Sequence, residues 1–149
     1  MRTPPRRRAR ELVLQGLYQR HLSRNDADVV RLDLAASRGY LRADQAYFGE
    51  LWDGVTREND ALLTALAPHL DRTPAELSPI ERAILLIGAW ELAHRIEIPY
   101  KVVINEAVEI AKSFGGTDGH RYVNGVLDKL AAELRATEIA ALRRSAAAT

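Results

Sequence analysis

The chain has 149 residues, of which 47% are hydrophobic and 28% are charged, so it has enough apolar sequence for one compact domain with a buried core. It has no cysteine, which excludes disulfides, thiolate nucleophiles and cysteine-based zinc sites and fits a reducing compartment. No apolar signal-peptide segment follows the N-terminal arginines, and the most apolar stretch, residues 83–93, is too short to span a bilayer. These features predict a soluble, cytoplasmic protein.

Charge is distributed unevenly along the chain. Residues 1–24 contain seven arginines and one acidic residue, a net charge of +6, whereas the other 125 residues contain 14 basic and 19 acidic residues, a net charge of −5. A basic arm of this kind typically contacts nucleic acid phosphates. A solvated, disordered terminus is the alternative interpretation.

Helical periodicity dominates the sequence, and no segment alternates like a strand. The pattern predicts an all-α single domain of about seven helices, at residues 6–22, 27–37, 44–67, 79–95, 100–114, 118–134 and 138–144. Three segments are expected: an extended basic arm at 1–5, a helical domain at 6–135, and a short helix with an alanine-rich tail at 136–149. Gly115 and Gly116 are expected to end one helix, and Thr117 to cap the next.

The clearest helix start is the segment Ser78-Pro79-Ile80-Glu81. Serine at the N-cap, proline at the first helical position and glutamate two residues later form a capping box. The helix that follows is apolar on nearly every side, which predicts that it is the central buried helix.

Catalytic motifs are absent from the sequence, which contains no phosphate-binding loop of the Walker type, no nucleophile elbow and no HExxH motif. Glu91 and His94 have the spacing of half a di-iron motif, but a second copy is missing. Glu106 and Glu109, followed by Lys112, are interpreted as a surface ion-pair ladder. We therefore expect no enzymatic activity, no metal and no cofactor.

The first helix combines arginines with an aromatic ring. Arg7 and Tyr18 lie about 20° apart around the helix axis, on the face expected to be exposed. Guanidinium groups clamp phosphates and exposed rings stack on unpaired bases, a combination that suits single-stranded RNA. Packing against the core is the alternative role for Tyr18. Asp118 and Tyr122 form a second polar and aromatic group, in which helix capping alone also explains Asp118.

Six segments resemble, in order and spacing, the NusB family of bacterial transcription antitermination factors: RRRARE at residues 6–11, QGLY at 15–18, ERAIL at 81–85, IPYKVVINEAVE at 98–109, AKSFG at 111–115 and YVNGVLD at 122–128. The resemblance covers residues 6–134. It implies two small helical bundles packed together. It also implies binding of the boxA element of nascent ribosomal RNA transcripts together with the ribosomal protein NusE, in a complex with RNA polymerase, NusA and NusG.

The resemblance also implies roles for individual residues. The expected RNA contacts are Arg6, Arg7, Arg8, Arg10, Tyr18, Asp118 and Tyr122. The expected NusE contacts are Glu81 and Arg82, and the expected buried hydrogen-bonding groups at helix junctions are Asn105, Glu106 and Asn124. Gly16 and Gly119 replace the alanine and serine common in the family, which is expected to loosen the RNA face.

Three alternatives to an RNA-binding adaptor are consistent with parts of the sequence. A similar helical domain is fused to RNA cytosine methyltransferases, but no cofactor-binding domain is expected in this sequence, which counts against an enzyme. A protein-binding scaffold with an incidental basic arm is a further alternative, which the salt dependence of RNA affinity separates from an RNA adaptor. Self-association into a homodimer that hides the arginine face is also open.

Overall fold

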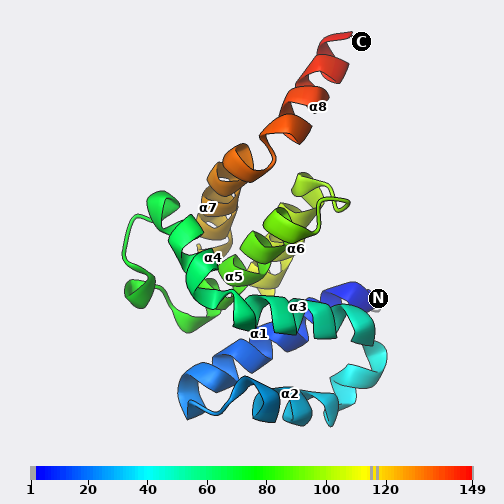
Figure 1. The fold of residues 1–149 in the computed structure, drawn as a ribbon, viewed down its shortest axis with the longest axis vertical. Helices are drawn as coiled ribbons and strands as arrows, with labels where there is room; N and C mark the ends of the chain where they lie inside the picture. The colour runs from blue at the N-terminus through cyan, green and yellow to red at the C-terminus, as the bar shows by residue number, and fades with distance from the viewer. Residues whose placement is uncertain (1–2, 115, 117, 149) are drawn as a thin grey trace.

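The structure is a computed structural model that describes residues 3–114, 116 and 118–148, and these residues contain helices and loops but no strands (Figure 1). The α-helices are α1 (Pro5–Ser23), α2 (Ala27–Ala35), α3 (Gln45–Arg57), α4 (Asn59–Leu66), α5 (Pro79–His94), α6 (Tyr100–Phe114), α7 (Gly119–Leu134) and α8 (Ala136–Ala148). Three short 3₁₀-helices are η1 (Arg38–Arg42), η2 (Ala67–His69) and η3 (Pro74–Glu76). The predicted all-α class is confirmed. Gly115 and Thr117, and the first two residues of the expected arm, lie outside the described residues.

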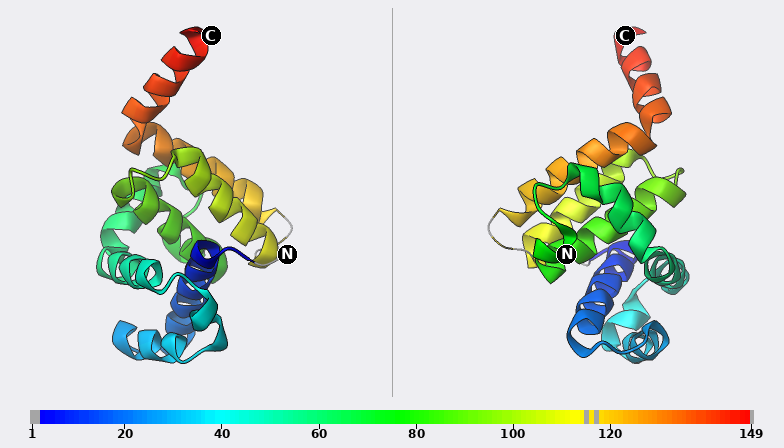
Figure 2. Two further views of the ribbon diagram at one scale, coloured as in Figure 1. Left: turned by 90° about the vertical axis from the view of Figure 1, so that its right-hand side faces the viewer. Right: turned by 60° about the vertical axis from the view of Figure 1, so that its left-hand side comes forward.

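The helices form two packed groups that share α5. In the first group α1 contacts α2, η1 and α3, and in the second α5, α6 and α7 contact one another. Helix α5 also contacts α1, α3 and α4, so it lies between the groups, as Figures 1 and 2 show. This arrangement places the start of α1 against α6 and the second half of α1 near the start of α5.

Helix α5 is the central helix, as its composition predicts. Every residue from 83 to 92 is buried. At the start of the helix, Ser78 Oγ accepts a hydrogen bond from the backbone N–H of Glu81 at 3.1 Å, and Pro79 is the first helical residue. None of the helices in the described ranges has the length and apolar character to cross a membrane.

The prediction of one long helix over residues 44–67 is wrong, because the helix is interrupted at Glu58, which divides it into α3 and α4. This residue leaves helical geometry, with φ −102° and ψ 16°. Its carboxylate lies 2.7 Å from His94 Nε2 at the end of α5, so the break brings Glu58 to the central helix. Eight α-helices therefore occur in the described part of the chain where seven were expected.

Gly16 lies where α1 crosses α3 at close approach. A Cβ atom added there would lie 2.5 Å from the Trp52 ring and 2.6 Å from Leu34. Gly16 is buried and allows close packing of α1 against its neighbours, and its effect on the RNA face stays a prediction.

Helix α8 is longer than expected, because the alanine-rich tail is helical through Ala148. The helix extends away from the rest of the molecule (Figures 1 and 2). Its base is fixed by the buried Arg135, which donates hydrogen bonds to the carbonyl oxygens of Leu92 at 2.8 Å and Ile98 at 2.9 Å. Arg135 also pairs with Glu138, whose carboxylate accepts the backbone N–H of Tyr100 at 2.9 Å. The junction of α7 and α8 is thus joined to the junction of α5 and α6.

Candidate nucleic-acid interface

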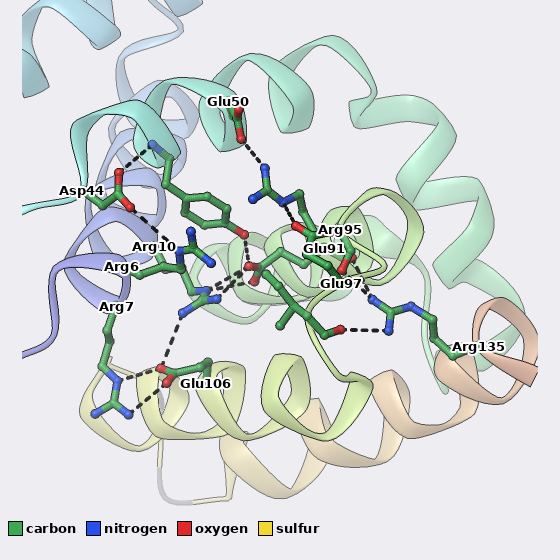
Figure 3. Close-up of polar contacts among 12 residues, drawn as sticks. Arg6, Arg7, Arg10, Asp44, Glu50, Glu91, Arg95, Glu97, Glu106 and Arg135 are labelled. Atoms are coloured by element: carbon green, nitrogen blue, oxygen red, sulfur yellow. Dashed lines mark hydrogen bonds and ion pairs between the residues drawn. The ribbon is translucent and has the colours of Figure 1, made fainter. Parts of the chain in front are cut away.

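The first turn of α1 presents three arginines in different environments. Arg6 is exposed, and its guanidinium lies 4.3 Å from the centre of the Tyr47 ring. Arg7 forms an ion pair with Glu106 on α6, with Nε 2.7 Å from Oε2 (Figure 3). Arg8 is half-buried, and its side chain has no hydrogen bond or ion pair within the described ranges. Among the described residues, Arg8 is therefore the one of the three whose guanidinium forms neither an ion pair nor a ring contact, and its charge interacts with that of Glu11.

Arg10 lies inside the protein, which makes its expected RNA contact wrong for this conformation. The residue is 3% exposed, and its Nη2 lies 2.9 Å from Glu91 Oε2 on α5. A helix turns about 100° per residue, which places Arg10 only about 20° from the half-buried Leu17 on the inner face of α1. Helical periodicity could therefore have predicted that Arg10, unlike the neighbouring arginines, faces the interior.

A hydrogen-bonded group surrounds the Glu91 carboxylate. Besides Arg10, which Figure 3 shows beside Glu91, the hydroxyl of Tyr47 on α3 donates a hydrogen bond to it. Burial alone would lower the pKa of Arg10, but its hydrogen bond and charge interaction with Glu91 outweigh this, so the pKa lies above its ordinary value. Burial and the adjacent Glu91 charge raise the pKa of Tyr47, which therefore stays protonated. This group joins α1, α3 and α5 and orients the start of α1.

Tyr18 projects from the same face of α1 as Arg7 and is 38% exposed. Eleven residues separate the two, so they lie about 16 Å apart along the helix axis. Glu11 lies between them on this face, and burial raises its pKa even though the charges of Arg8 and Arg7 oppose the shift. An exposed ring and a cationic helix end therefore share one side of α1.

A second group of expected contacts meets where α5 and α7 begin. Glu81 approaches Gly119, since a Cβ atom on that glycine would lie 3.9 Å from the Glu81 carboxylate. Asp118 is exposed and makes no side-chain capping bond. Tyr122 is half-buried beneath the Arg72 guanidinium, which lies 4.4 Å from the ring centre. The expected RNA and NusE residues therefore adjoin at this end of the molecule.

Arg72 was missed by the sequence reasoning, because it lies in a loop without periodicity. Its Nε is 2.6 Å from Asp71 Oδ1, and this hydrogen bond is the main cause of the lowered pKa of Asp71. Burial raises the pKa of Tyr122, so the ring beneath Arg72 remains a neutral phenol.

The three residues expected to be buried at helix junctions differ in outcome. Glu106 is half-buried and ties α6 to Arg7, as expected. Asn105 and Asn124 are exposed, and their side chains form no hydrogen bond in the described part of the chain, so the expectation for these two is wrong. Both lie on outward faces of their helices and are available to contact a partner.

The candidate metal residues instead form ion pairs. Glu91 binds Arg10, and His94 lies against Glu58. Glu109 pairs with Lys112 at 3.5 Å, as the ladder interpretation predicts, whereas Glu106 faces Arg7. No group of three or more potential metal ligands occurs among the residues that the structure describes.

The fold and these surfaces define a small all-α protein that presents a cationic helix end and an exposed aromatic ring. The chain belongs to the NusB family, whose family model matches residues 7–132. Among curated relatives, the transcription antitermination protein NusB of Ralstonia nicotianae is 59% identical over 145 residues, which cover 95% of this chain and 94% of the relative. NusB of Ralstonia pickettii is 60% identical over 138 residues, covering 93% and 89%. Both relatives are transcription antitermination proteins.

Solved structures have the same fold. NusB of T. maritima superimposes with a TM-score of 0.78 at 28% sequence identity, covering 89% of this chain and 94% of that chain. A crystal structure of the antitermination factors NusB and NusE in complex with double-stranded RNA gives a TM-score of 0.72 at 21% identity, covering 84% and 94%. The second likeness establishes the shared fold.

Proposed function

We propose that this chain is an RNA-binding adaptor that binds the boxA element of nascent ribosomal RNA transcripts together with NusE. The observation that carries the proposal is the exposed side of α1, where a free arginine and an exposed tyrosine occur in a member of the NusB family. A protein of the same fold forms a complex with NusE and double-stranded RNA, which supports NusE and RNA as classes of partner. The proposed ligand is single-stranded, because an exposed ring stacks on an unpaired base.

The proposed contacts divide between phosphates and bases. Arg6 and Arg8 contact phosphates, and Tyr18 stacks on a base. Arg7 contributes from its ion pair with Glu106, which limits its freedom to turn toward RNA. Asp118 and Tyr122 extend the contact to the start of α7. Arg10 is left out, since its guanidinium is buried against Glu91.

NusE is proposed to bind at the start of α5, through Glu81 and Arg82. Both side chains are half-buried and point from the first turns of the central helix. Because Glu81 adjoins Gly119, a protein bound there would also approach the RNA residues of α7. This proximity provides a physical route for cooperative binding of RNA and NusE.

The wider assembly and the free state are also part of the proposal. With RNA and NusE bound, the chain joins NusA, NusG and RNA polymerase in the cytoplasm and prevents termination of ribosomal RNA transcripts. Without partners it forms a homodimer. Val102 and Phe114 on α6, 43% and 42% exposed, offer apolar surface for such self-association. Light scattering of the free protein tests the dimer, which a monomer mass at all concentrations would contradict.

Fluorescence anisotropy with a short boxA-like single-stranded RNA tests the central proposal, with and without NusE, at about 50 and 200 mM salt. Arg8→Ala is the informative variant, because it removes a cation whose side chain forms no hydrogen bond or ion pair among the described residues. We expect it to weaken RNA binding by about tenfold and to reduce the salt slope by about 0.7, the value for one phosphate contact on a single strand. Arg143→Ala on the distant helix α8 is the matched control and should bind as the native protein does.

Two further variants distinguish the contacts with RNA bases from the contacts with NusE. Tyr18→Leu, which keeps an apolar side chain but removes the ring, is expected to weaken single-stranded RNA more than double-stranded RNA. Glu81→Ala is expected to abolish the gain in RNA affinity that NusE gives while leaving binding of RNA alone unchanged. Equal RNA binding by Arg8→Ala and the native protein would place the RNA face elsewhere.

A further inference from the structure

A cavity of about 530 Å³ lies between the end of α1, the break between α3 and α4, and the start of α5. Four arginines line it, Arg20, Arg24, Arg57 and Arg82, together with His21, and the one carboxylate among its lining residues is Asp60. The four arginines come from three separate segments of the sequence, so the fold, and not a local charge run, brings them together.

The four arginines of the cavity form no ion pair with any described residue. Elsewhere on the surface, Arg31 and Arg95 form ion pairs with carboxylates. Of the residues described, by contrast, no carboxylate pairs with the guanidinium groups of the cavity, and Arg20 donates only to the Asn25 carbonyl oxygen at 3.4 Å. Like charges that converge without counter-charges destabilise a fold. A bound anion would remove that repulsion.

The backbone at Arg24 supports a ligand role for this cavity. Arg24 is the residue at which α1 ends in a left-handed turn, with φ 61°, and it is the one non-glycine residue with positive φ in the described ranges. Glycine adopts this conformation without strain, whereas another L-residue costs about 1 kcal/mol or more. Local strain retained in this way is typical of positions where the side chain has a function. Here the strained residue supplies a cation to the cavity.

The cavity is separate from the proposed RNA face of α1. Arg20 follows Tyr18 by two residues, so the two side chains lie about 200° apart around the helix axis. RNA stacked on Tyr18 would therefore run on the other side of α1. The cavity does reach Arg82, which belongs to the proposed NusE surface.

We propose that this cavity binds a compact anion carrying two or more phosphoryl groups, such as a free oligophosphate or the phosphate chain of a nucleotide. Guanidinium groups match phosphoryl oxygens with paired N–H donors, and several of them surround one volume here. A ligand with a single carboxylate would neutralise one of the four arginines. An oligophosphate instead places several negative charges within the same cavity. The proposal does not depend on RNA binding.

Isothermal titration calorimetry of the full chain with pyrophosphate, tripolyphosphate and ATP tests the proposal. Arg24→Gly is the sharpest variant, because it removes the cation while glycine keeps the left-handed turn, so the fold is expected to be retained or stabilised. Arg57→Ala removes a second cation from a different helix. Each is expected to weaken oligophosphate binding by about tenfold or more. Arg38→Ala, an exposed arginine outside the cavity, is the control and should bind as the native protein does.

The outcomes distinguish a free oligophosphate from RNA as the ligand of the cavity. They also separate failure of the cavity proposal from failure of the proposed RNA face on α1. Oligophosphate binding that Arg24→Gly and Arg57→Ala lose, and that Arg8→Ala keeps, supports the cavity whatever happens to RNA. Equal loss in Arg38→Ala would indicate non-specific charge attraction and overturn the proposal. No binding of any oligophosphate, or tighter binding of an acidic peptide than of tripolyphosphate, would also overturn it. If only RNA binding responds to Arg24→Gly and Arg57→Ala, the cavity is part of an RNA path and the proposed free ligand is wrong.

Discussion

At the scale of single residues, the ion pair of Arg10 and Glu91 is shielded from water, since the two side chains are 4% and 1% exposed. Desolvation opposes the attraction in such a pair, so its net stabilisation is small, but removing one partner leaves an uncompensated buried charge. We therefore expect Arg10→Met to lower the free energy of unfolding by about 3–5 kcal/mol. Urea denaturation followed by circular dichroism measures this change.

The double variant Arg10→Met/Glu91→Met identifies the cause of that loss. It removes both charges and keeps apolar volume, so part of the lost stability is expected to return, although the Tyr47 hydroxyl loses its acceptor. Arg8→Ala, in the same turn of α1 but without a buried partner, should change stability by less than about 0.5 kcal/mol. A double variant as unstable as Arg10→Met would show that buried charge is not the origin of the loss.

The arginine run shows what the sequence could predict at this scale. Charge alone located the basic helix end, but it treated Arg8 and Arg10 alike. Their environments differ because the helix turns about 200° between them, which directs Arg10 toward α5. A buried glutamate in an otherwise apolar helix requires a cationic partner. An ion pair of Glu91 with some arginine or lysine was therefore predictable from the sequence. Which cation would reach it could not be read without the packing of α1 on α5.

At the scale of helices, the contact of α1 with α3 depends on the absence of a side chain at Gly16. Alanine has the higher helix propensity, by about 1 kcal/mol, but its Cβ would overlap the buried Trp52 ring. We expect overlap to dominate, so that Gly16→Ala lowers the free energy of unfolding by about 1–3 kcal/mol in urea denaturation.

Gly125 provides the matched control for this prediction. It lies inside α7 with open space around its Cα, since a Cβ atom there meets no atom within 4 Å. Gly125→Ala should therefore gain helix propensity without overlap and raise stability by about 0.5–1 kcal/mol. If both variants were stabilised, the crossing at Gly16 would be able to widen at little cost.

Helix boundaries were predicted well where the residues themselves set them. Ser78 and Pro79 located the start of α5, because capping is a local interaction. The break at Glu58 was missed, since neither proline nor glycine occurs there and the contact with His94 forms only in the folded chain. The full length of α8 was also not predicted. Alanine is the strongest helix former, so the alanine-rich end of the chain already favoured a longer helix.

At the scale of the whole molecule, Glu91 is the point where the helix groups are joined. Its carboxylate binds Arg10 of α1 and Tyr47 of α3, and its carbonyl oxygen accepts a hydrogen bond from Arg135 at 3.2 Å. The first helices, the central helix and the base of α8 are thus connected through one residue of α5. Because a domain of this size typically unfolds in one cooperative step, a change in this connection should affect the stability of the entire fold.

Alkaline pH tests this connection through Tyr47. Its pKa in the folded protein lies above the ordinary value of 10.0, so below that pH both states are protonated and the full stabilisation is present. Above it the unfolded state loses the Tyr47 proton and the folded state keeps it, so the contribution to stability falls as pH rises. Tyr47→Phe cannot titrate, and at about pH 8 we expect it to be less stable than the native protein by about 1–3 kcal/mol, the cost of a missing hydrogen bond to Glu91.

Between about pH 10 and pH 11, the difference in unfolding free energy between the native protein and Tyr47→Phe should shrink by about 1 kcal/mol, because only the native protein carries this titration. Urea denaturation at each pH, followed by tryptophan fluorescence, measures the difference. A difference that stays constant through this range would mean that Tyr47 ionises equally in both states. Glu91 would then not hold the Tyr47 proton in the fold, and the Tyr47 hydroxyl would not contribute to the joining of α3 to the central helix.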